Sequence, residues 1–130
     1  MTSLRKIFAA LISAMIVGGA SAQAEVDRSA LLGKWKVIEQ HPSGAALVTT
    51  VQFDQDSHFT TSTTVNGNLY MSASGTWKVS GKSLVWRYET SSNPAVQSGY
   101  VDTDEIASVG SRELSLVSKL SGKPHVYQRF

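Results

Sequence analysis

The sequence contains no cysteine, so neither disulfides nor thiolate ligands can stabilise this chain. The same absence leaves no cysteine for lipid attachment behind the apolar segment near the start of the chain. A stable fold must therefore come from packing and hydrogen bonding alone.

The chain also lacks a strong excess of charge of one sign. It has 12 basic and 10 acidic residues, and two of the basic ones, Arg5 and Lys6, lie in an N-terminal segment that we expect to be removed. Ten residues of each sign then remain. This balance excludes the basic footprint that binding to nucleic acid or anionic lipid requires.

Long hydrophobic runs are missing except at residues 7–17, which follow Arg5 and Lys6 and precede small residues ending in Ala22-Gln23-Ala24. This pattern is typical of a secretory signal peptide with an A-x-A cleavage site. A membrane anchor is the alternative, but the run is well short of the roughly 20 residues that span a bilayer. We therefore expect a signal peptide over residues 1–24 and one mature domain over residues 25–130, periplasmic or secreted and not membrane-spanning.

A helical period is absent after this segment, apart from a short turn before Gly33 that Asp27 or Ser29 can cap. Seven turn signals, such as Asn66-Gly67-Asn68 and Ser80-Gly81, separate segments rich in Val, Thr and aromatic residues with alternating polarity. The pattern predicts an all-β fold, an eight-stranded antiparallel up-and-down β-barrel, with a two-sheet sandwich as the alternative. The expected strands are 34–41, 46–53, 58–65, 69–79, 83–90, 96–107, 112–118 and 125–130.

Turn lengths predict the register of the central hairpins. A three-residue loop at residues 66–68 pairs Val65 with Leu69, Thr63 with Met71 and Phe59 with Gly75. A two-residue loop at residues 80–81 pairs Trp77 with Leu84 and Gly75 with Trp86, which sets large rings opposite small partners.

Two stretches nearly repeat each other, "GKWKV" at residues 33–37 and "GTWKV" at residues 75–79. The residues that follow them diverge, which argues against an internal duplication. In a meander of alternating strands, Trp35 and Trp77 lie at the same end of the barrel. We interpret them as two indoles that close that end, with glycine leaving room for a neighbouring ring.

The stretch "LLGKWKV" resembles the Gly-x-Trp opening of the lipocalins and the wider calycin superfamily, and more closely the small lipocalin-like domains of exported bacterial proteins. In that family the tryptophan closes the barrel and an arginine of the last strand packs across it. The resemblance implies that Arg129, in "HVYQRF", stacks on Trp35. The structural closed end then comprises Gly33, Trp35, Gly75, Trp77 and Arg129.

Signatures of catalysis and of metal or cofactor binding are lacking. His41, His58 and His125 are scattered, and the sequence has neither a Gly-x-Ser-x-Gly elbow nor a glycine-rich phosphate loop. We expect no catalytic residues, no metal, no cofactor and no enzymatic activity.

The remaining candidate site is the open end of the barrel, where the predicted inward face carries hydroxyls beside apolar side chains. Its residues are Thr49, Thr61, Thr63, Met71, Tyr88 and Tyr100. Such a wall is what a pocket for a small, mostly apolar molecule requires. The alternative is a filled barrel acting as a protein-interaction module of the cell envelope, such as a protease inhibitor or assembly factor.

Overall fold

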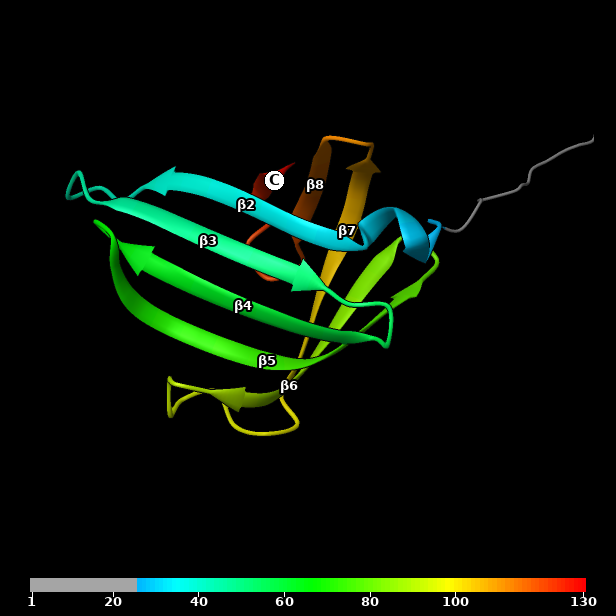
Figure 1. The fold of residues 1–130 in the computed structure, drawn as a ribbon, viewed down its shortest axis with the longest axis horizontal. Coiled ribbons are helices and arrows are strands. Elements are labelled where there is room, and N and C mark those ends of the chain that lie inside the picture. Colours follow the sequence, from blue (N-terminus) through cyan, green and yellow to red (C-terminus); the bar gives the residue numbers. More distant parts are fainter. Residues whose placement is uncertain (1–25) are drawn as a thin grey trace, which may run out of the picture.

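The computed structural model describes residues 26–130, which form a closed barrel of eight antiparallel strands joined in chain order (Figure 1). The strands are β2 (Gly33–Gln40), β3 (Ala46–Phe53), β4 (His58–Val65), β5 (Asn68–Ser80), β6 (Ser83–Ser91), β7 (Val101–Val109), β8 (Glu113–Ser118) and β9 (Pro124–Arg129). The barrel closes where β2 pairs with β9, with Trp35 opposite Arg129. This closure confirms the predicted barrel and rules out the two-sheet sandwich. The expected signal peptide, residues 1–24, lies outside the described residues.

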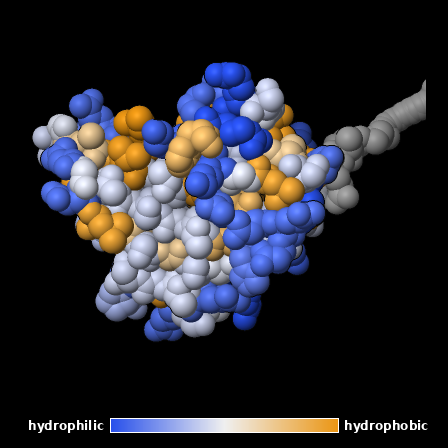
Figure 2. All heavy atoms as spheres, viewed as in Figure 1, coloured by the Kyte–Doolittle hydropathy of each residue, from blue (hydrophilic) through white to orange (hydrophobic). Residues whose placement is uncertain are grey.

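The strands form because apolar and polar side chains alternate along them, which places one face of each strand inside the barrel. The inward side chains build one core of buried apolar residues. Its fully or almost fully buried members are Leu31, Trp35, Phe53, Phe59, Trp77, Leu84, Ile106, Leu114 and Leu116. By contrast, the outer wall over β3, β4 and β5 is rich in serine and threonine, and this region is pale in Figure 2.

The hairpin between β4 and β5 has a shorter loop than predicted. Val65 pairs with Asn68, so the loop is Asn66-Gly67, and both of its residues have positive φ, at 50° and 86°. Such backbone angles suit the tight turns that Asn-Gly favours. The predicted pair of Val65 with Leu69 is therefore wrong. A bulge after Thr63 restores the predicted pairs of Thr63 with Met71 and Phe59 with Gly75.

The hairpin between β5 and β6 also differs from the prediction. Ser80 pairs with Ser83, which places Trp77 opposite Trp86 and Gly75 opposite Tyr88. The predicted pairs, Trp77 with Leu84 and Gly75 with Trp86, are wrong by two residues. An even shift leaves every side chain on the predicted face, because side-chain direction repeats every two residues along a strand.

The largest error in the predicted strand boundaries concerns β7. The prediction began this strand at residue 96, whereas β7 is Val101–Val109. Residues 92–100 instead form turns, including bonds from the Val96 amide to the Asn93 carbonyl and from the Tyr100 amide to the Gln97 carbonyl. The alternating pattern of the sequence does not distinguish these turns from a strand.

The short 3-10 helix η3 (Arg28–Leu31) crosses one end of the barrel, at the right of Figure 1. Asp27 caps η3 as predicted, because its carboxylate accepts a hydrogen bond from the Ser29 amide. Among residues 26–130, no helix is both long and apolar enough to cross a membrane.

Trp35 is fully buried under η3, and its indole N–H donates to the Leu31 carbonyl at 2.8 Å. The Arg129 guanidinium lies 4.1 Å from the centre of the Trp35 ring and donates to the carbonyls of Leu32 and Ala30. Gly33, at φ 115°, leaves the space that Arg129 occupies, since a Cβ there would lie 2.7 Å from its Nη1. The stacking implied by the family resemblance is confirmed.

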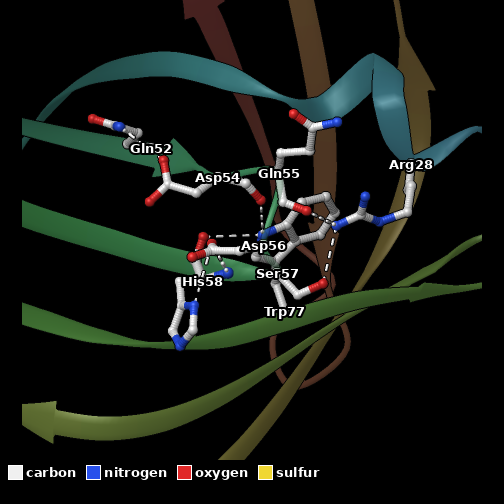
Figure 3. Close-up of polar contacts among 8 residues, drawn as sticks. All are labelled: Arg28, Gln52, Asp54, Gln55, Asp56, Ser57, His58 and Trp77. Atoms are coloured by element: carbon white, nitrogen blue, oxygen red, sulfur yellow. Dashed lines mark hydrogen bonds and ion pairs between the residues drawn. The ribbon is translucent and has the colours of Figure 1, made fainter.

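The second Gly-x-Trp unit is covered in the same way by a different arginine. Arg28 of η3 lies 4.6 Å from the centre of the Trp77 ring and donates to the Gln55 carbonyl and the Ser57 hydroxyl of the β3–β4 turn (Figure 3). The Trp77 indole N–H donates to the His58 carbonyl at 3.1 Å. The near-repeat in the sequence therefore reflects two strands that each place an arginine-covered tryptophan at the closed end.

Candidate functional site

The open end of the barrel, opposite η3, contains an interior cavity of about 230 Å³. Its wall is built by inward side chains from every strand except β2. The lining residues are Thr49, Val51, Thr61, Thr63, Met71, Trp86, Tyr88, Asp102, Asp104, Ser118, His125 and Tyr127. A larger hollow of about 420 Å³ lies mostly over outward Ser and Thr side chains of β4 to β6. We take the interior cavity as the candidate site, because it is enclosed by side chains that converge from seven strands.

Five of the six residues predicted for this end line the cavity: Thr49, Thr61, Thr63, Met71 and Tyr88. Tyr100 does not. It follows the turns before β7, has 45% of its surface exposed and packs on the Tyr88 ring with the centroids 5.9 Å apart. The expected strand over residues 96–107 had placed Tyr100 on the inward face, and the late start of β7 removes it from the cavity.

The hydroxyls of the cavity wall differ in their availability. Thr49 and Thr63 share one hydrogen bond between their hydroxyls at 2.9 Å, while the Thr61 hydroxyl donates to the Thr50 carbonyl. A shared hydroxyl pair still has acceptor lone pairs and one free donor. Thr49 and Thr63 can thus exchange hydrogen bonds with a molecule in the cavity.

An aromatic cluster forms the floor of the cavity. Phe59 packs edge-on against both Trp86 and Tyr88, with centroids 5.0 and 5.4 Å away. These contacts fix the two lining rings, which therefore present a preformed apolar surface to the cavity.

Two aspartates of β7, Asp102 and Asp104, face the cavity, and the sequence interpretation missed both. They lie within the expected strand 96–107 but were not among the predicted site residues. The alternation of side chains along a strand could have placed both aspartates on the inward face. Ile106 is a buried apolar residue, and residues two and four positions before it lie on the same face of the strand. Asp104 accepts a hydrogen bond from the Trp86 indole at 2.9 Å, and Asp102 accepts one from the Thr103 amide.

Burial shifts the acid–base properties of these groups. Burial, with the nearby Asp102 charge, raises the pKa of the Asp104 carboxyl above its ordinary value. Burial and the charges of Asp102 and Asp104 raise the pKa of Tyr88 to about 12. The pKa of Tyr127 is also raised, mainly by burial. Both phenols therefore stay protonated donors at neutral pH.

His125 lies at the side of the cavity and is paired through Nδ1 with the Glu39 carboxylate of β2, at 2.5 Å. Within residues 26–130, this histidine makes no hydrogen bond to a serine, threonine or tyrosine hydroxyl. The same part of the chain holds no group of three or more His, Asp or Glu side chains placed to bind a metal ion.

The closed, eight-stranded up-and-down barrel with an interior cavity at one end defines the class of this protein. No family model and no curated protein sequence matches the chain. Among solved structures, it is similar to a lipocalin-like protein from Bacteroides uniformis at 17% identity, with a TM-score of 0.56 over 78% of this chain and 99% of that chain. Identity this low shows the fold alone. The chain has a lipocalin-like fold.

Proposed function

We propose that this protein binds a small, mostly apolar molecule inside its barrel, at the open end, and is not an enzyme. The observation that carries the proposal is the interior cavity of about 230 Å³, whose wall combines rings and aliphatic side chains with hydroxyls, two carboxylates and His125. Val51, Met71, Trp86 and Tyr88 offer the apolar surface, and Thr49 and Thr63 offer polar contacts. The lipocalin-like fold supports a small-molecule-binding role as well.

The alternative, a protein-interaction module, has less support. A filled barrel or a mobile N-terminal arm at residues 25–30 would favour it. The described part of that arm, from Val26 to Leu32, packs on the barrel: the Val26 amide donates to the Gly81 carbonyl, and Arg129 bonds the carbonyls of Ala30 and Leu32.

Filling the cavity should abolish binding without unfolding the protein. We expect Thr63→Trp and Met71→Trp each to lower the affinity for a neutral fluorescent probe, such as 1-aminoanthracene, by at least about tenfold, because the new indole takes the space of the ligand. Inserting a larger side chain into a packed core lowers the free energy of unfolding by about 1–3 kcal/mol. If the melting temperatures of both variants stay close to that of the wild type, the cavity has room for the indole. The measurement is fluorescence titration with thermal melts alongside.

Tyr70→Trp is the matched control for these two variants. Tyr70 precedes Met71, but 72% of its surface is exposed, so an indole there stays outside the barrel and should leave probe binding unchanged. If the wild type binds no apolar probe and both inward variants melt far below it, the barrel is solid. The interaction module then becomes the better explanation.

We also propose that the protein is exported after cleavage of its signal peptide, into the periplasm or out of the cell. The support is the basic pair Arg5 and Lys6, the apolar run of residues 7–17 and the Ala22-Gln23-Ala24 signal. N-terminal sequencing of the exported protein should read from Glu25, or from Gln23 if the earlier site is used. A sequence starting at Met1 would contradict this proposal.

A further inference from the structure

The wall of the cavity carries two carboxylates, and the basic side chain that lines it with them, His125, is paired with Glu39. Asp102 and Asp104 face inward from β7, and no lysine or arginine lines the cavity. The ion pairs of residues 26–130 are those of His58 with Asp56 and His125 with Glu39, so neither aspartate takes part in one. Partly burying carboxylates without a cation opposes folding. Such an arrangement suggests that a partner of opposite charge occupies the site in function.

Two half-buried phenol hydroxyls of the same cavity lack hydrogen-bond partners in the described part of the chain. Tyr127 and Tyr88 both line it, and in the described part of the chain neither phenol hydroxyl forms a hydrogen bond. Polar groups that a protein leaves without a partner in a cavity are commonly completed by a ligand or by water. These hydroxyls are a feature independent of the carboxylates, and they also point to an occupant with polar atoms.

An indole hydrogen bond fixes one of the two carboxylates. Trp86 donates its indole N–H to one oxygen of Asp104, which holds that carboxylate at the edge of the ring. A ligand whose cation contacts Asp104 can therefore place its apolar body against the Trp86 and Tyr88 rings, which line the same cavity.

The geometry points to an organic ammonium ion as the ligand class, with its charged nitrogen held by Asp102 and Asp104 and its apolar body packed against Trp86, Tyr88 and Met71. This inference rests on the proposed function, because it assigns the chemistry of the same cavity. It makes the predicted ligand mostly apolar with one cationic head, such as an amine on a single ring with a short side chain.

A series of three compounds that differ mainly in charge tests the assignment. Phenethylamine, 2-phenylethanol and 3-phenylpropanoate are titrated by calorimetry at about pH 7.5, where the amine and the carboxylates are charged. We expect the amine to bind at least about tenfold more tightly than the alcohol, as a charge-assisted hydrogen bond implies. The propanoate should bind more weakly than either.

Isosteric variants test whether Asp102 and Asp104 cause the preference for the amine over the alcohol. Asp102→Asn and Asp104→Asn should each weaken amine binding by about tenfold and leave alcohol binding nearly unchanged. Asp104→Asn keeps an acceptor for the Trp86 indole, and we expect it to melt no lower than the unliganded wild type. Asp56→Asn is the control, because it removes one carboxylate from the β3–β4 turn at the closed end, outside the cavity.

The outcomes separate this inference from the proposed function. If the alcohol binds as tightly as the amine and the Asn variants do not discriminate between them, the ammonium assignment is wrong while the cavity remains a binding site. If none of the three compounds binds and 1-aminoanthracene also fails to bind the wild type, both proposals are wrong.

Discussion

Replacing Trp35 with alanine is expected to lower the free energy of unfolding by about 3–5 kcal/mol, as for other buried aromatic truncations. Trp35 is fully buried, its indole donates to the Leu31 carbonyl and its ring supports the Arg129 guanidinium. The truncation removes all three contacts together. The loss is a large share of the 5–15 kcal/mol that typically holds a domain folded. Urea unfolding followed by circular dichroism measures it without relying on tryptophan fluorescence.

Tyr70→Ala serves as the control for this truncation. It also removes a large aromatic side chain, but one that is 72% exposed, so the change should stay within about 0.5 kcal/mol. A loss below about 1 kcal/mol for Trp35→Ala would show that the closed end does not depend on this residue. The likeness to the lipocalin arrangement would then be superficial.

Gly75→Ala is the second substitution with a large expected effect. A Cβ at this position would lie 1.9 Å from the Arg87 carbonyl oxygen and 3.0 Å from the Phe59 ring. The nearest obstacle is backbone, so the β5–β6 ladder itself would have to move. We expect a loss at or above the upper end of the about 1–3 kcal/mol typical of overpacking, measured by urea unfolding.

Gly110→Ala is the matched control for Gly75→Ala. Its Cβ would meet only the Glu113 carbonyl at 3.9 Å, which is ordinary contact. Neither glycine has a positive φ, so the two variants add the same methyl group without left-handed backbone strain. Equal stability of both variants would contradict the close approach of β5 and β6 at Gly75.

Much of the fold could be predicted from the sequence because its signals are local. The strands Ala46–Phe53 and His58–Val65 have the predicted bounds, since period-two alternation and turn residues mark both ends. Register was harder to predict. The bulge after Thr63 offset the loop length of the first hairpin, and bulges leave no clear mark in a single sequence. In the second hairpin the turn lies one residue later than predicted, since Ser80 pairs with Ser83.

The site was predicted less completely than the fold. The predicted inward face gave five of the lining residues correctly, but Asp102 and Asp104 were not assigned to it. The role of Arg28 was also missed. Its stacking on Trp77 depends on where η3 crosses the barrel, a tertiary arrangement that no short motif encodes.

The central claim, that ligand binds inside the open end, is tested most directly by the three indole N–H signals in an amide NMR spectrum. The chain has 3 tryptophans, and only Trp86 lines the cavity. The indoles of Trp35 and Trp77 donate to backbone carbonyls at the closed end. On titration with phenethylamine, we expect the Trp86 indole signal to shift while those of Trp35 and Trp77 stay in place. Saturable binding that leaves Trp86 unmoved would place the ligand elsewhere and contradict the account.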